Sequence, residues 1–240
     1  MAVCILFISI TRKTMLIFIS VLLVCIMCSL LVVGVISTAD YGKLGLTVVI
    51  DAGHGGRDGG CVGVNTNVKE SDLNLVYASV LGEYFKRTGI KVVYTRTSKN
   101  GLYSIFGRNY KQEDMKNRKE IIETANADMV ISIHMNTFPI STEKGAQVFY
   151  YKGSEESKLV AECIQKQFKS NLAYGRSLAK TGDYYILNCT SLPSILIECG
   201  FLSSPEEEQL LISEDYQKTL CYYIFCGVVQ YFGVVSGIAI

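Results

Sequence analysis

The fold of this chain is decided by TVVIDAGHGGRDGG, residues 47–60. Its first five residues form a short apolar run, which is typical of a buried β-strand, and the glycines after it allow the backbone to turn tightly where that strand ends. Other apolar runs of similar length recur along the chain, and we expect each to be a strand. They are residues 91–95, 129–134, 145–151, 184–187 and 194–198.

Segments with helical periodicity separate these runs. Residues 71–88 carry apolar side chains three and four positions apart, and a glycine closes the segment. The other expected helices are 115–126, 154–171, 205–211 and 214–232, and the polar and aromatic residues 97–114 are expected to form a loop. Alternating strands and helices predict an α/β fold: a single layered domain, residues 47–240, with a mostly parallel, roughly six-stranded sheet flanked by helices.

The first 37 residues differ from this pattern. Residues 14–37 include no charged side chain, and this stretch exceeds the roughly 20 residues that cross a bilayer. Arg12 and Lys13 precede it, so we expect a transmembrane signal-anchor with its N-terminus in the cytoplasm, followed by a linker at 38–46. The alternatives are a buried globular helix and a cleaved leader, since residues 37–39 are small enough for a poor cleavage site.

Composition narrows the class of protein. A formal net charge of +1 without a basic run predicts no nucleic-acid partner. With 49% hydrophobic residues and three prolines, the chain is not expected to be disordered. The nine cysteines show no metal-binding or disulfide spacing, and we interpret them as small buried hydrophobic residues.

Candidate functional residues gather at the ends of the expected strands. Ligands of open α/β sheets bind beyond the carboxyl ends of the strands, where Asp51, His134 and Glu198 fall. The chain has only two histidines, His134 and the loop residue His54, and both would lie at this edge. Two imidazoles on one sheet edge indicate a metal site, although a lone histidine is usually structural.

A catalytic zinc site takes three protein ligands and keeps one position open. Glu70 begins the first expected helix and could supply the third ligand, or it could simply favour the helix dipole. Glu198 ends an otherwise apolar strand, where a buried charge is costly unless it is paired or has a chemical role. We interpret it as a general base, the alternative being a side chain turned to water.

Substrate contacts are expected from Asn136, Arg57 and Arg96, although either arginine could equally be a surface residue. The glycine-rich loop could also be interpreted as a phosphate cradle, but it lacks the GxxxxGK[ST] pattern and a correctly placed GxGxxG. Nucleotide binding is therefore not expected.

Four sequence blocks resemble the zinc-dependent N-acetylmuramoyl-L-alanine amidases, in the order of that family. They are VVIDAGHGGRDGG (48–60), KESDLNL (69–75), SIHMN (132–136) and ILIECGFLSSPEEEQLL (195–211). The resemblance implies that His54, Glu70 and His134 hold one zinc ion per chain and that Glu198 is catalytic. It implies hydrolysis of the amide between N-acetylmuramic acid and L-alanine in peptidoglycan.

Further stretches resemble the germination-specific amidases of endospore-forming bacteria. They are GLYS (101–104), DMKNR (114–118), NTFPIS (136–141), KGAQVFYY (144–151) and SEESKLVAE (154–162). This resemblance implies a role in spore cortex, where the enzyme works with a deacetylase to form muramic lactam. The catalytic domain would lie outside the cytoplasm, in the cell envelope or the intermembrane space of the forespore.

Peptidoglycan is then the expected substrate, and the N-terminal helix is expected to bind the membrane. Whether the enzyme needs an accessory protein is not decided by the sequence. Two other functions are weighed against the amidase: a zinc peptidase that cuts the stem peptide, and a non-catalytic wall-binding scaffold.

Overall fold

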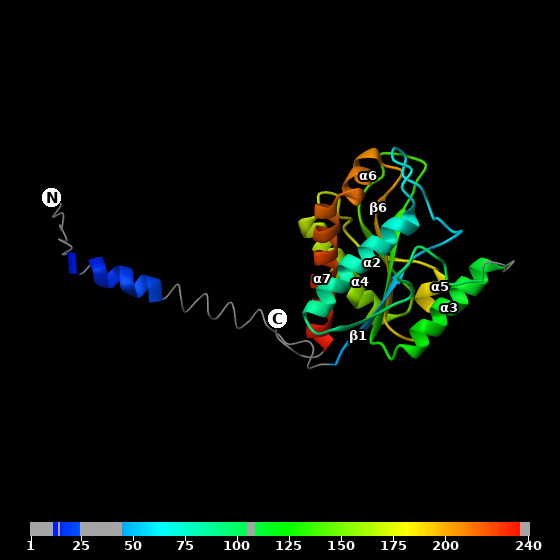
Figure 1. Ribbon diagram of the computed structural model, residues 1–240. Coiled ribbons are helices and arrows are strands. Elements are labelled where there is room, and N and C mark those ends of the chain that lie inside the picture. The colour runs from blue at the N-terminus through cyan, green and yellow to red at the C-terminus, as the bar shows by residue number, and fades with distance from the viewer. Residues whose placement is uncertain (1–11, 14, 25–44, 105–108, 236–240) are drawn as a thin grey trace. The chain divides into compact units, whose positions relative to one another are not determined.

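The computed structural model describes residues 12–13, 15–24, 45–104 and 109–235 (Figure 1). The chain divides into two units, Met1–Asp40 and Tyr41–Ile240. In the first unit, the described residues Met15–Val24 form an apolar helix, and residues 1–11, 14 and 25–37 of the expected anchor segment lie outside the described part. The expected linker lies outside it as well, except for residues 45–46.

A six-stranded sheet forms the centre of the second unit, in the order β2-β1-β3-β6-β4-β5. Its strands are β1 (Thr47–Ala52), β2 (Lys91–Tyr94), β3 (Met129–Asn136), β4 (Gln147–Tyr150), β5 (Lys180–Thr181) and β6 (Ser194–Phe201). All neighbouring pairs are parallel except β4 and β6, which run antiparallel. The expected mostly parallel six-stranded sheet is therefore confirmed.

Helices cover both faces of this sheet (Figure 1). They are α2 (Glu70–Arg87), α3 (Tyr110–Thr124), α4 (Glu155–Asn171), α5 (Tyr185–Asn188), α6 (Pro205–Ile212) and α7 (Glu214–Val235). Alternation along β1 divides the core, because Val48 and Ile50 pack with the side chains of α2, α4 and α7, whereas Val49 packs with those of α3 and α5.

Helix α7 is the one helix among the described residues that is long and apolar enough to cross a membrane. It packs against both α2 and α4, and 44% of its most apolar stretch is buried within the domain. Packing within the domain therefore accounts for part of its apolar composition.

Two elements differ from the sequence-based expectation. Residues 184–187 are not a strand: Tyr184 precedes the single helical turn α5, and this turn buries Ile186 and Leu187 together against the sheet. A two-residue strand, β5, lies just before it. Helix α3 begins at Tyr110, inside the expected loop. Asp114 and Arg118 lie one helical turn apart in this helix and form an ion pair.

Strand register brings the functional side chains to one edge. Asp51 pairs with Ser132 across β1 and β3, and His134 pairs with Glu198 across β3 and β6. Residues directly opposite each other on neighbouring strands point to the same face, so His134 and Glu198 share the face that also carries α3 and α5.

Candidate active site

Three residues from three different elements meet at this edge. His54 follows β1 with a left-handed backbone (φ 61°), Glu70 is the first residue of α2, and His134 lies near the end of β3. Glu70 Oε1 lies 3.1 Å from His54 Nε2 and 2.9 Å from His134 Nδ1. The three potential ligand atoms all lie within 4.8 Å of one another. Two imidazole nitrogens and one carboxylate oxygen in this arrangement form a donor set that suits a catalytic zinc ion.

Neighbouring groups hold these side chains in place. Asp58 Oδ2 lies 3.0 Å from His54 Nδ1, which leaves Nε2 directed at the centre of the cluster. Glu70 accepts hydrogen bonds from the backbone N–H of Cys61 (2.8 Å) and of Met135 (3.1 Å). A carboxylate behind a histidine ligand is a common support of metal sites. The sequence analysis missed Asp58, although it lies four residues after His54 in the same loop.

The charges of the carboxylates around His54 favour the binding of a cation at the cluster. Burial opposes protonation of His54, but hydrogen bonds and charge from Glu70 and Asp58 raise its pKa to about 9. Burial would raise the pKa of Glu70, but the two histidines hold it well below its usual range. The carboxylate is therefore ionised, and a metal ion that binds His54 must displace a proton.

Glu198 lies beside the cluster without belonging to it. Its side chain is 8% exposed, and its Oε2 atom has no hydrogen-bond partner among the described residues. Burial raises the pKa of Glu198 to about 7; the charge of His134 opposes this rise and that of Glu70 adds to it. A carboxylate that titrates near neutral pH and keeps a free oxygen can take up a proton from a reacting group.

Arg118 is buried beneath the loop that carries His54 and holds it through hydrogen bonds and ion pairs. It is 1% exposed, forms ion pairs with Asp51 and Asp114, and donates a hydrogen bond to the carbonyl of His54. Burial would raise the pKa of Asp51, but Arg118 and the hydroxyls of Ser132 and Thr95 lower it to about 2. This buried ion network fixes the backbone that carries His54.

The expected substrate contacts have different surroundings. Arg96 is 4% exposed and donates to the carbonyls of Ala52, Gly53 and Ser71, so its placement favours holding the loop against α2 over contact with substrate. Arg57 is exposed and lies over the ring of Tyr110, 4.7 Å from its centroid. Asn136 is half-buried at the end of β3.

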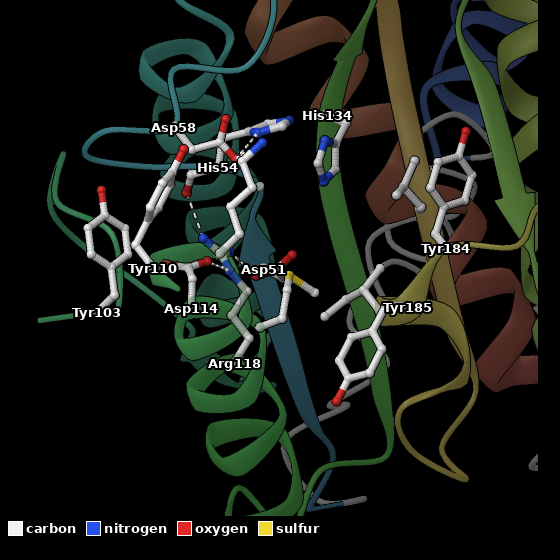
Figure 2. A pocket seen from close by; sticks show the side chains of 15 residues that line it. Asp51, His54, Asp58, Tyr103, Tyr110, Asp114, Arg118, His134, Tyr184 and Tyr185 are labelled. Carbon is white, nitrogen blue, oxygen red and sulfur yellow. Dashed lines mark hydrogen bonds and ion pairs between the residues drawn. The ribbon is translucent and has the colours of Figure 1, made fainter. Parts of the chain in front are cut away.

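A pocket of about 260 Å³ opens beside the two histidines (Figure 2). Tyr103 and Tyr110 lie on the side of α3, and Tyr184 and Tyr185 lie on the side of α5. Apolar and aromatic side chains make up much of its wall, and His54 and His134 lie at one end. Concave apolar pockets with a few convergent polar groups are typical of substrate sites.

Comparisons with known proteins identify the family of this chain. The sequence profile described as N-acetylmuramoyl-L-alanine amidase matches residues 48–230. The germination-specific N-acetylmuramoyl-L-alanine amidase of Bacillus subtilis is 37% identical over 193 residues, which cover 78% of this chain and 80% of that protein. The chain therefore belongs to the N-acetylmuramoyl-L-alanine amidase family, and the resemblance noted from the sequence is confirmed.

Solved structures support the same assignment. The CwlD amidase of Clostridioides difficile, determined in complex with the GerS lipoprotein, matches with a TM-score of 0.75 and 38% identity, covering 79% of this chain and 99% of that one. The catalytic domain of CwlV from Bacillus (Paenibacillus) polymyxa matches with a TM-score of 0.70 and 29% identity, over 79% and 99% of the two chains. The protein is thus an amidase, a hydrolase that acts on peptidoglycan.

Proposed function

We propose that this chain is a zinc-dependent amidase of spore-cortex peptidoglycan, tethered to the membrane by its N-terminal segment. The observation that carries the zinc assignment is the convergence of His54, Glu70 and His134 beside a buried carboxylate, Glu198, that is not among them. This separation of a ligand set from a neighbouring base is what metal-assisted hydrolysis requires.

The residues divide the reaction between them. Zinc held by the cluster would lower the pKa of a bound water molecule and polarise the carbonyl of the scissile amide. Glu198 accepts the proton of the attacking water through its free Oε2 atom and then donates it to the nitrogen of the leaving L-alanine. Asp58 keeps the imidazole of His54 oriented, and the buried Arg118 network holds the loop that carries His54.

The cortex assignment rests on relatives. The B. subtilis protein is named germination-specific, and the C. difficile amidase was determined with a lipoprotein partner. By extension, we include an accessory lipoprotein among the partners of this chain, and we place its catalytic domain outside the cytoplasm. Arg57 and Asn136 are kept as proposed substrate contacts, because both lie at the open edge that carries the cluster.

Substitution of one ligand tests the metal centre. His134→Ala should lose bound zinc and peptidoglycan hydrolysis together, measured as metal per chain by atomic absorption and as amino groups released from purified wall. Lys152→Gln, an exposed change remote from the cluster, serves as the control and should retain both. Full zinc occupancy in the His134 variant would show that the site is drawn wrongly.

A further inference from the structure

A second hollow lies at the same end of the sheet, and none of the three residues of the metal cluster lines it. It has a volume of about 170 Å³ and joins a wider surface groove through shared residues. The hollow and the groove share four lining residues, all polar or charged: Glu143, Gln147, Arg176 and Lys180. Asn136, Phe149 and Phe201 also line the hollow.

Positive charge exceeds negative charge in this hollow. The guanidinium of Arg176 pairs with Glu143 at 2.7 Å and lies 5.1 Å from the ring centroid of Phe201. Its Nε atom is buried and has no partner among the described residues. Lys180 is exposed and forms no ion pair with any described residue, whereas the nearby Lys144 is paired with Glu206. The hollow thus carries one exposed cation without an ion-pair partner among the described residues, Lys180, and one unsatisfied donor, Arg176 Nε.

The order of the strands shows where this hollow lies relative to His134 and Glu198. His134 lies on β3 and Glu198 on β6, whereas the hollow reaches across the sheet from Asn136 on β3 and Phe201 on β6 to Gln147 on β4 and Lys180 on β5. Neighbouring strands are separated by about 4.8 Å, so β5 lies about 10 Å from β6. That distance equals roughly three residues of extended peptide.

The path of the proton indicates on which side of the site each half of the cleaved substrate lies. Glu198 returns its proton to the leaving nitrogen, so the peptide that carries this nitrogen leaves on the side of Glu198, toward β4 and β5. The acyl half, which carries the sugar, is directed to the pocket beside the histidines, where the aromatic side chains of Tyr103, Tyr110 and Tyr184 line the wall.

We propose that the hollow formed by Arg176 and Lys180 is the subsite for the free carboxylates of the stem peptide, and that the tyrosine pocket takes the glycan. This inference rests on the proposed amidase function. It adds Arg176 and Lys180 to the basic residues that are proposed to recognise substrate.

Two muramoyl-peptide substrates test the assignment, one with free stem-peptide carboxylates and one with those carboxylates amidated. Lys180→Gln should lower kcat/KM for the free-carboxylate substrate by about twofold to fivefold, the range of an exposed ion pair. Arg176→Gln, at a partly buried position, should lower it by about tenfold. Neither change should alter kcat/KM for the amidated substrate beyond twofold, and Lys152→Gln, which lies outside the hollow, should affect neither substrate.

Equal losses on both substrates, or no loss on either, would overturn the subsite. Lys180 is exposed, so its variant is expected to fold even if the Arg176 variant does not. Failure of the amidase function itself would look different, because the unaltered protein would then release no peptide that begins with L-alanine from either substrate.

Discussion

Replacing Glu198 with glutamine should change stability and activity in opposite directions. The change removes a buried carboxylate that has an oxygen without a partner and keeps the shape of the side chain. In the metal-free chain, burial raises the pKa of Glu198 from 4.5 to about 7. Holding an ionised carboxylate there costs the folded state about 3 kcal/mol at full ionisation.

The sign of this effect sets the pH window. The folded-state pKa is raised, so the cost is absent below pH 4.5, grows as the pH rises, and is complete above pH 7. Glu198→Gln should therefore stabilise the metal-free domain at pH 8 by about 1–3 kcal/mol, after allowance for water penetration, and leave it nearly unchanged at pH 4.5. Urea unfolding of a chain that begins at Asp40, with a chelator present, measures this difference.

Activity should respond in the other direction. Glutamine cannot accept the proton, so turnover of the zinc-loaded variant should fall by about 10²–10⁴-fold with zinc content unchanged. Glu208→Gln is a matched control, because Glu208 is also buried but accepts hydrogen bonds from the backbone N–H groups of Asn65 and Thr66. That change should destabilise the domain at pH 8. A Glu198 variant that is less stable than the unaltered chain at pH 8, or that turns over normally with zinc bound, would refute the reasoning.

Asp51→Asn should cost about 3–5 kcal/mol in urea unfolding at pH 7, because Arg118 is left buried with one partner fewer. With the pKa of Asp51 lowered to about 2, the stability from this pair is present above pH 3.8 and should be lost as the pH falls toward 2. Asp58→Asn should weaken zinc binding by about tenfold or more in calorimetric titration, since His54 loses its orienting carboxylate. Zinc affinity should fall as the pH drops below about 9, because protons compete for His54. A chain that begins at Asp40 should stay soluble and still cut isolated wall, whereas the full chain should sediment with membranes.

The sequence predicts the sheet well because buried parallel strands are continuous apolar runs, and it places His134 and Glu198 because both end such runs. It does not predict α5, since a four-residue apolar segment can be a strand or a single helical turn, and only the tertiary position of Ile186 and Leu187 decides between them. Arg96 is a similar case, because its burial depends on backbone carbonyls of Ala52 and Gly53 that local sequence does not reveal.

The masses of the fragments released from purified peptidoglycan test the central claim most directly. Cleavage at the amide of muramic acid should release whole stem peptides whose free amino terminus is L-alanine, and the glycan strands should stay intact. The zinc-loaded Glu198→Gln chain should release almost none of them. Peptides shortened from within the stem, with L-alanine still attached to the glycan, would contradict the account and identify a peptidase instead.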